Sequence, residues 1–448
     1  HAVQRDQNPA CWRNGKQHGI GKFIWQSTAT YDGDWLDGMA HGHGTYVGPT
    51  GDKYVGEWRY NKKHGEAIVT WTTGEEYKGE YKDGNRHGDG EAAIGNRCGH
   101  ASAVFVDWLA GETYNGEWRH DKRNGQGVWG KSNGDVYEGT FENDDRHGLG
   151  VMNESNDVYD GEWVRNVKQG HGVMTGSNGD IYDGAWTDDV KSGYGTMSWK
   201  SRAKGVAADG VHDMHKGADY KGEWREDMPH GEGEMKFVND DRYNGVWENG
   251  VRSGLGKYTW GGDAEGDYYD GRWKNVGGVP LRCGRGVEEK GSADPEKKIM
   301  YDGEWLNDIK HGVGRMVRGN GEKYEGEWKD EKRHGRGAAT FPVSGPGIAE
   351  GTYDSYHGEW KEGQTYGHGT MIWHYGDQYE GEFAEGNRRD GRGVYEWKNG
   401  DKYDGDYQGN KRHGKGKWTS FDGNYYNGEW ITDKKHGVGS YTYADGQS

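Results

Sequence analysis

Tyr324-Glu325-Gly326-Glu327-Trp328, followed after a short charged loop by Lys332-Arg333-His334-Gly335-Arg336-Gly337, is the stretch that decides the fold of this chain. The pattern Tyr, any residue, Gly, any residue, aromatic recurs sixteen times, and ten of the fifteen steps between copies are 22 to 24 residues long. The copies begin at Tyr31, Tyr54, Tyr77, Tyr114, Tyr137, Tyr159, Tyr182, Tyr220, Tyr243, Tyr269, Tyr301, Tyr324, Tyr356, Tyr379, Tyr403 and Tyr426. A repeat of this period predicts a linear array of stacked units in place of separate globular domains.

Bulk composition disfavours several classes of protein. Only 31% of residues are hydrophobic, yet 22 Trp and 30 Tyr recur at fixed phase, which is not typical of a disordered chain. A formal net charge of -17 argues against nucleic acid as a partner. The three cysteines, Cys11, Cys98 and Cys283, form neither a disulfide framework nor a zinc motif, so we expect no metal site and a reducing compartment. No apolar run approaches the roughly 18 residues of a transmembrane span.

The repeat unit has the period of a β-strand, because side chains in a strand alternate between two faces. Tyr324, Gly326 and Trp328 are expected on one face and the two glutamates on the other. Both glycines of Gly335-Arg336-Gly337 are expected to point to the aromatic side and to leave room for the rings. Turn sequences within and between units predict hairpins. The fold class is therefore all-β: an elongated, single-layer antiparallel β-meander of stacked β-hairpins.

The array has irregular segments. Residues 1–30 are expected to form a degenerate leading repeat with Trp12 at the aromatic position, and residues 31–448 a continuous array. Insertions at 92–113, 198–219, 287–300 and 338–355 all follow the second strand of a unit, so they leave the sheet at the same edge. A smaller expansion, 275–281, lies at the opposite edge. Ala67 replaces the second glycine of its unit, and its Cβ is expected to crowd the aromatic side.

The first insertion contains Phe105, Trp108 and Leu109 in an apolar run. Two interpretations remain open: the run covers or extends the sheet, or it anchors a partner protein.

Several short motifs suggest chemistry that the repeat explains better. Gly125 to Ser132 matches a phosphate-binding loop and runs on into a Gly-x-Ser-x-Gly pattern, but both motifs need a strand that leads into a helix. Here a strand and a turn lead into the next strand. A histidine precedes the first glycine of Gly-x-Gly in many units, and copies about 10 Å apart are too far apart to share a zinc ion, so a turn or capping role is favoured. We therefore predict no catalytic residues, no cofactor and no enzymatic activity.

The unit Tyr-x-Gly-x-Trp, a short loop and Gly-x-Gly resembles the MORN repeat, and the resemblance extends from Trp12 to about Gly446. It implies a single-layer antiparallel sheet curled into a half-pipe with aromatic residues on the concave side. It also implies a scaffold role in cytoskeletal, ciliary or membrane-junction assemblies, with phosphoinositide binding proposed for some members.

The leading hypothesis is a non-enzymatic scaffold in a large assembly, cytoplasmic and associated with the cytoskeleton, a cilium (axoneme) or a membrane. It would hold helices or extended segments of partner proteins along an aromatic-lined trough. The tryptophans expected to be exposed as groove anchors are Trp163, Trp186, Trp224, Trp247, Trp305, Trp328 and Trp360. Sheet ends without a cap predict self-association or a partner at the ends.

The first alternative is a phosphoinositide-binding module that uses basic hairpin loops on one edge, and the second is the regulatory repeat region of a larger enzyme. The candidate contacts with anionic lipid are Lys62, Lys63, Lys122, Arg123, Lys332, Arg333, Lys411, Arg412, Lys434 and Lys435.

Overall fold

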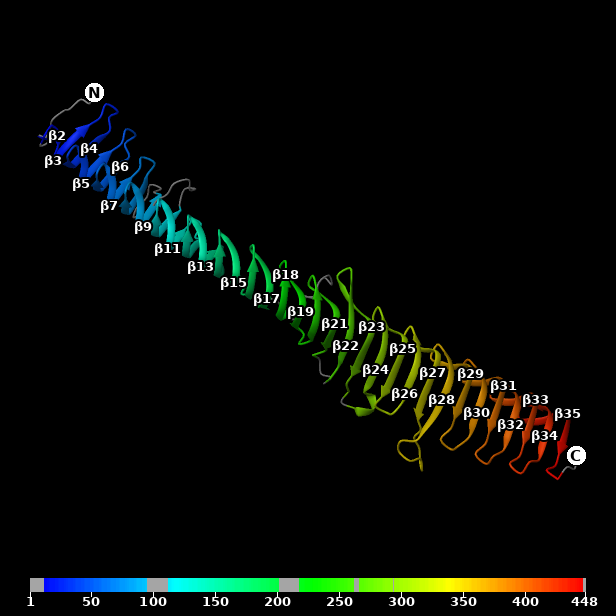
Figure 1. The fold of residues 1–448 in the computed structure, drawn as a ribbon. Helices are drawn as coiled ribbons and strands as arrows, with labels where there is room; N and C mark the ends of the chain where they lie inside the picture. Colours follow the sequence, from blue (N-terminus) through cyan, green and yellow to red (C-terminus); the bar gives the residue numbers. More distant parts are fainter. Residues whose placement is uncertain (1–11, 95–111, 201–216, 262–265, 293, 446–448) are drawn as a thin grey trace. The chain divides into compact units, whose positions relative to one another are not determined.

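The computed structural model describes residues 12–94, 112–200, 217–261, 266–292 and 294–445. Strands β3 to β35 form one antiparallel sheet of 33 strands that is not closed, and β1 and β2 form a separate two-stranded sheet. Figure 1 shows hairpin following hairpin in sequence order. The strands are β1 (Trp12–Arg13), β2 (Lys16–Gln17), β3 (Gly19–Ile24), β4 (Thr30–Leu36), β5 (Met39–Val47), β6 (Lys53–Arg59), β7 (Lys62–Thr70), β8 (Glu75–Lys82), β9 (Asn85–Ile94), β10 (Thr113–Arg119), β11 (Lys122–Gly130), β12 (Val136–Glu142), β13 (Asp145–Glu154), β14 (Asp157–Val164), β15 (Val167–Thr175), β16 (Ile181–Thr187), β17 (Val190–Ser198), β18 (Gly217–Arg225), β19 (Met228–Phe237), β20 (Arg242–Glu248), β21 (Val251–Thr259), β22 (Tyr268–Val276), β23 (Val279–Lys290), β24 (Ile299–Leu306), β25 (Ile309–Arg318), β26 (Lys323–Lys329), β27 (Lys332–Pro342), β28 (Tyr353–Lys361), β29 (Gln364–Ile372), β30 (Gln378–Ala384), β31 (Arg388–Glu396), β32 (Lys402–Gln408), β33 (Lys411–Thr419), β34 (Tyr425–Ile431) and β35 (Lys434–Thr442). The predicted fold class, an all-β meander of hairpins, is confirmed.

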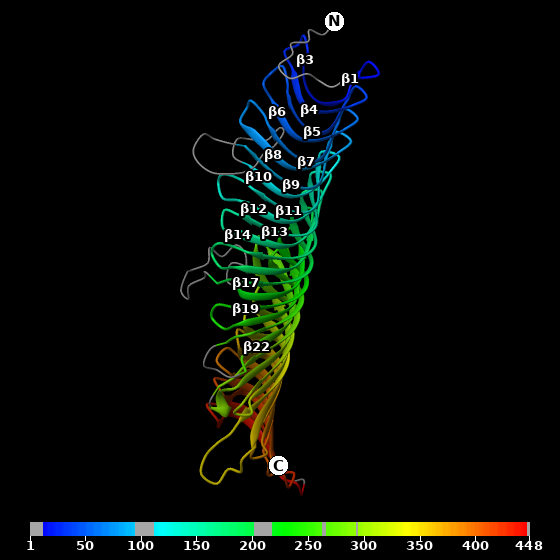
Figure 2. The same cartoon turned by 90° about the vertical axis from the view of Figure 1, so that its left-hand side faces the viewer.

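The chain divides into two compact units, which are described separately. Unit 1 comprises residues 1–201 and 223–228, and unit 2 comprises residues 202–222 and 229–448. In Figure 2 the hairpins of unit 1, coloured blue to green, are curved ribbons stacked one behind another. A three-residue 3-10 helix, η2 (Pro295–Lys297), is the one helical segment among the described residues.

Each hairpin has two faces and two edges, which we name from the repeat in β26 and β27. The aromatic face carries Tyr324 and Trp328, both buried, and the outer face carries the exposed Glu325 and Glu327. The predicted alternation is therefore confirmed. The loop edge holds the tight turn inside each hairpin, where Asp330 and Glu331 have φ of 50° and 68°. Two consecutive positive φ values are typical of the type I′ turn that favours a hairpin. The turn edge holds the connections between hairpins.

The prediction that both glycines of Gly-x-Gly point to the aromatic side is wrong. Gly326 pairs with Gly337, but Glu327 pairs with His334, so β27 contains a bulge at Gly335 and Arg336. Gly335 has φ of 55°, a left-handed conformation that glycine adopts without steric cost. A Cβ built on Gly335 would meet the Glu327 carboxylate on the outer face. The Arg336 N–H donates to Glu327 Oε1 at 2.9 Å, so this carboxylate caps the bulge.

The other two glycines of the unit are required by the tyrosine ring. A Cβ built on Gly326 would lie 2.5 Å from Gly337 Cα, and one on Gly337 would lie 2.5 Å from the Tyr324 hydroxyl. The ring therefore lies over a bare glycine pair, and its hydroxyl donates to the Glu327 carbonyl oxygen at 2.7 Å.

Ala67 occupies the position of the second glycine in its repeat. Tyr54 above it is nevertheless only 1% exposed and still donates to the Glu57 carbonyl oxygen at 2.7 Å. The expected crowding by the Ala67 Cβ is absorbed without loss of this burial or this hydrogen bond.

Two insertions can be followed at the turn edge of unit 2. In 287–300, β23 runs on to Lys290, and η2 precedes β24. In 338–355, the strands continue past the usual limit and pair up to Pro342 and Tyr353. Both insertions therefore lengthen hairpins. Most of 92–113, with Phe105, Trp108 and Leu109, and most of 198–219 lie outside the described residues.

Candidate interaction surfaces

The tryptophans predicted as exposed anchors are buried. Their exposed fractions run from 1% to 5%, and they are Trp163, Trp186, Trp224, Trp247, Trp305, Trp328 and Trp360. Each indole of this set packs edge-on against a tyrosine of the preceding repeat, as Trp328 does on Tyr301 with ring centroids 5.3 Å apart and an interplanar angle of 84°. Because Trp328 also packs on Tyr324 at 5.2 Å, the rings form a continuous column within each unit. The expectation of exposure is wrong, because neighbouring rings cover one another.

Hydrogen bonds fix the same indoles in place. Trp328 Nε1 donates to the Gly314 carbonyl oxygen at 3.0 Å, one repeat back along the chain. Burial raises the pKa of the Tyr324 hydroxyl, which therefore remains a donor at neutral pH. The tyrosine thus closes its own hairpin, whereas the tryptophan joins its hairpin to the preceding one.

A row of hydrogen bonds, the loop-edge clamp, joins consecutive repeats at the loop edge. The Arg412 N–H donates to Asp433 Oδ1 at 2.9 Å, and the Arg412 guanidinium lies 4.4 Å from the Trp430 ring centroid. A cation over an aromatic face contributes about 0.5–1 kcal/mol at exposed sites and more when desolvated. The same backbone bond joins Arg86 to Asp121, Arg123 to Asp144, Arg146 to Asn166, Lys168 to Asp189, Lys191 to Asp227, Arg282 to Asp308, Lys310 to Glu331 and Arg389 to Asn410.

The basic residues predicted to contact anionic lipid are of two kinds at this edge. The second residue of each pair lies over the aromatic column, with its charged group within 6 Å of a ring centroid; these are Lys63, Arg123, Arg333, Arg412 and Lys435. Arg333 also forms an ion pair with Glu322. The first residue of each pair is exposed; these are Lys62, Lys122, Lys332, Lys411 and Lys434. Half of the predicted lipid contacts therefore pack against aromatic rings of the protein itself.

A second row, the turn-edge clamp, joins repeats at the opposite edge. Asp401 Oδ1 accepts from the Phe421 N–H at 2.9 Å, and the two residues are 20 positions apart. The same bond joins Thr72 to Asp52, Ser155 to Asp135, Ser177 to Asp157, Lys200 to Asp180, Gly261 to Asp241, Gly291 to Asp267, His374 to Asp354 and Lys398 to Asp377. Sequence reasoning missed both clamps, although Asp or Asn at a fixed phase of the repeat was the available signal.

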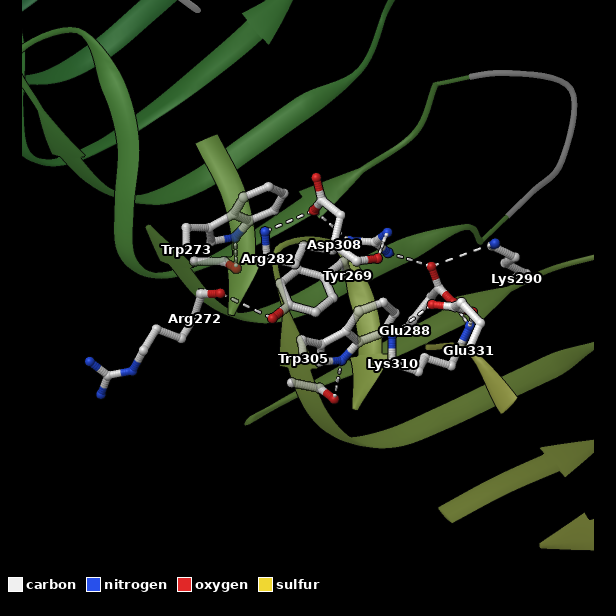
Figure 3. A network of polar contacts seen from close by, with 12 residues as sticks. Tyr269, Arg272, Trp273, Arg282, Glu288, Lys290, Trp305, Asp308, Lys310 and Glu331 are labelled. Atoms are coloured by element: carbon white, nitrogen blue, oxygen red, sulfur yellow. Dashed lines mark hydrogen bonds and ion pairs between the residues drawn. The ribbon is translucent and has the colours of Figure 1, made fainter. Parts of the chain in front are cut away.

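The carboxylate of Glu288 is buried within the aromatic column of unit 2 (Figure 3). Glu288 is 3% exposed and occupies a position where the adjacent repeats carry Tyr258 and Met316. Arg282 Nη1 lies 2.6 Å from its Oε1, and Lys310 Nζ lies 3.3 Å from its Oε2. Burial opposes ionisation of Glu288, but Lys310, Lys290 and Arg282 outweigh it and lower the pKa of this carboxyl. Lys310 also contacts Glu331 at 3.1 Å, so the cluster extends the loop-edge clamp inward. The signal in the sequence was Glu288 itself, a charged residue at a repeat position where the adjacent repeats carry Tyr258 and Met316.

Four partly exposed rings, with the buried Tyr395 between them, continue the aromatic face toward the turn edge of unit 2. This C-terminal aromatic strip consists of Trp373, Tyr395, Trp397, Trp418 and Tyr441. Trp373 and Tyr395 have ring centroids 5.5 Å apart, and Tyr395 and Trp397 have theirs 4.7 Å apart. The Arg389 guanidinium lies 5.0 Å from Tyr395. Unlike the rings of the buried column, Trp373, Trp397, Trp418 and Tyr441 keep part of their surface accessible.

The remaining sequence motifs lie in strands and turns of the repeat. Gly125 lies in β11, and a turn leads from Gly130 to β12, so the phosphate-loop match is strand and turn as predicted. His64 and His334 have buried Nδ1 atoms without a hydrogen-bond partner among the described residues, so no bond from Nδ1 supports the capping alternative of the predicted turn or capping role. Within the described ranges, no group of three or more His, Cys, Asp or Glu side chains is placed to hold a metal ion. The part of the chain that the structure describes holds no helix of the length and hydrophobicity that spans a bilayer.

Comparison with known proteins agrees with this architecture. The MORN repeat family matches sixteen segments, which together make up well over half of the chain. They are residues 11–29, 31–53, 54–76, 77–91, 114–136, 137–153, 159–181, 182–203, 220–242, 243–262, 301–323, 324–344, 356–378, 379–402, 403–425 and 426–448. The chain belongs to the MORN-repeat family.

Two individual proteins are similar to parts of it. MORN repeat-containing protein 3 of Xenopus laevis is 37% identical over 78 residues, which are 17% of this chain and 30% of that relative. Among solved structures, a streptogramin B lyase covers 69% of this chain and 85% of its own at 12% identity, and its TM-score of 0.12 has no bearing on fold or function. Family membership supports a repeat-based role in binding proteins or membranes.

Proposed function

We propose that this protein is a non-enzymatic scaffold that holds partner proteins of a large assembly along its array. The observation that carries the proposal is the pair of clamps, because they join many successive repeats at one or both edges. Side chains at equivalent positions of successive repeats are thereby held at a fixed spacing of about 10 Å, the width of two paired strands. Such a surface suits helices or extended segments that make the same contact several times.

The proposed partner site is the C-terminal aromatic strip, which replaces the buried tryptophan column as the anchor surface. Half-exposed Trp and Tyr rings are the side chains that most often dominate binding energy at protein interfaces. Arg389 and Arg412 flank the strip, with their guanidinium groups 5.0 Å from the Tyr395 ring centroid and 5.7 Å from that of Trp397. A cytoskeletal, ciliary or membrane-associated setting remains part of the proposal.

The test is crosslinking mass spectrometry in the native assembly with a variant that carries Trp373→Ala, Trp397→Ala and Trp418→Ala. A matched control carries Trp71→Ala and Trp129→Ala, two half-buried tryptophans of unit 1. Hydrogen exchange first establishes that both variants keep their sheet. We expect the strip variant to lose its intermolecular crosslinks around residues 373–441 and the control to keep them. An unchanged crosslink pattern in the folded strip variant would refute the proposed site.

Membrane binding is the second candidate, favoured by the exposed lysines Lys62, Lys122, Lys332, Lys411 and Lys434, which recur at one place of the loop edge. Each basic residue near an anionic surface contributes about 1 kcal/mol of attraction, which salt screens. Flotation with phosphoinositide vesicles tests this role. Binding at low salt that disappears when the five lysines become glutamine supports it, and no binding at low salt excludes it.

A further inference from the structure

The outer face of unit 1 between β11 and β17 carries exposed apolar side chains. Leu149 is 69% exposed and Tyr194 is 58% exposed, and both occupy the middle position of Gly-x-Gly. Val128 and Val151, 40% and 37% exposed, lie on the same face two residues further along their strands. Apolar side chains gathered on one exposed face are typical of a protein interaction site.

Acidic residues alternate with this apolar row. Glu138 pairs with Val128 on one side and Val151 on the other, and Asp160 pairs with Val151 and Val173. Asp183 continues the series beyond Val173, with its carboxylate 3.0 Å from His171 Nε2. We name this surface, from Val128 to Tyr194, the acidic-apolar face.

The same positions in unit 2 carry a different pattern. Asp302 faces Arg315 across the strands and lies 3.5 Å from the Arg285 guanidinium, and Asp404 lies 3.2 Å from that of Arg392. In unit 2, Asp270, Asp302 and Asp404 each pair with one basic residue across the strands, although Val287 and Val394 also occur on that face. Glu138 and Asp160 of unit 1 pair only with valines. Glu138 and Asp160 therefore have no basic residue paired with them across the strands, whereas Asp183 lies beside His171.

We propose that the acidic-apolar face binds a basic amphipathic helix of a partner protein. This inference rests on the proposed scaffold role but concerns a different surface from the aromatic strip. Strands β12 to β16 are paired on both sides, so no strand edge is open to an extended peptide, and a helix is the element that covers a sheet face. The acids recur every second strand, about 10 Å apart. Residues i and i+7 of a helix are about 10.5 Å apart, so Lys or Arg at heptad spacing meets each acid in turn while Leu149 and Val151 pack between them.

The test uses a synthetic amphipathic helix of about 21 residues with lysine at i, i+7 and i+14 and leucine beside each lysine. A peptide of the same composition with the lysines moved out of heptad spacing is the control. Fluorescence anisotropy measures the binding of each to the full chain. We expect the heptad peptide to bind at least about ten-fold more tightly, and high salt to weaken it.

Two matched variants locate the contact. Leu149→Glu is expected to weaken binding of the heptad peptide by about ten-fold or more, because it places a charge in the apolar row. Leu255→Glu, at the equivalent position of unit 2 and 62% exposed, is expected to change affinity less than about two-fold. The triple variant Glu138→Lys, Asp160→Lys, Asp183→Lys is expected to abolish binding while hydrogen exchange of β12 to β16 stays unchanged.

Several outcomes would overturn the inference. Equal affinity for the two peptides, or equal effects of Leu149→Glu and Leu255→Glu, would show that no specific face is used. A photoreactive residue at position 149 that crosslinks within the chain to residues 95–111 would show an internal occupant, and concentration-dependent dimerisation lost in Leu149→Glu would show a second copy. In either case the crosslinks of the aromatic strip still decide the scaffold role independently.

Discussion

Substitution of the three glycines in one repeat should destabilise it to different degrees, although all three become alanine. In Gly326→Ala the new Cβ would lie 2.5 Å from Gly337 Cα and 2.6 Å from the Arg336 carbonyl oxygen, both backbone atoms that cannot rotate away. In Gly337→Ala it would meet the Tyr324 ring, which is a side chain and can tilt. We expect a loss above about 3 kcal/mol for Gly326→Ala and about 1–3 kcal/mol for Gly337→Ala.

Ala67 supports the lower value for Gly337→Ala, since Tyr54 remains buried above a natural alanine. Gly335→Ala is expected to cost about 1–2 kcal/mol, because its backbone is left-handed. A long array does not unfold in one step, so local hydrogen exchange of β26 and β27 is the suitable measurement. Glu325→Ala, on the exposed outer face, is the control. Equal losses for Gly326→Ala and Gly337→Ala, or a larger loss for Gly337→Ala, would refute the argument from the glycine pair.

Three further predictions concern the contacts between and within repeats. Trp328→Phe keeps an aromatic ring at this position but removes the donor to the Gly314 carbonyl oxygen and some packing, so local exchange should show a loss of at least about 1–2 kcal/mol; an unchanged rate would mean that this bond contributes nothing. Asp433→Ala should raise exchange near Arg412 by a similar amount, whereas Asp433→Asn should keep most of the clamp. Glu288 has a folded-state pKa below its ordinary value, so its stabilisation is complete above about pH 5 and is lost as pH falls through the lower folded-state pKa. Glu288→Gln should therefore destabilise unit 2 at neutral pH and reduce the acid dependence of exchange in residues 286–290; a parallel acid profile would contradict this.

The architecture was predictable from the sequence because one unit, exemplified by Tyr324 and Trp328, repeats with the period of a strand. The bulge at Gly335 was missed because a strict two-residue alternation has no place for extra residues in one strand. The burial of Trp328 was missed because a single sheet layer suggests an open face, whereas rings from successive repeats cover one another at about 5 Å. The clamps were missed because each links residues about one repeat apart. The sequence shows that these residues recur at a fixed position of the repeat, but it does not show that they contact one another.

Candidate sites were less predictable than the fold for a related reason. The repeat constrains the residues that hold hairpins together. The regular positions of the sequence are therefore those whose side chains already contact other parts of the protein. The surfaces that remain accessible for binding, such as the strip at Trp397 and the face at Leu149, lie at positions where the repeat permits many residue types.

The orientation of the meander also has a mechanical consequence. Its backbone hydrogen bonds run along the direction in which hairpins succeed one another, so a load applied to the two ends of either unit separates strands one pair at a time. Each hairpin of 22 to 24 residues that detaches releases roughly 80 Å of extended chain. Where a clamp joins a hairpin to its neighbour, that clamp must open before the hairpin detaches. Under tension, either unit should lengthen in discrete, reversible steps of one repeat and shorten by the same steps when the tension falls.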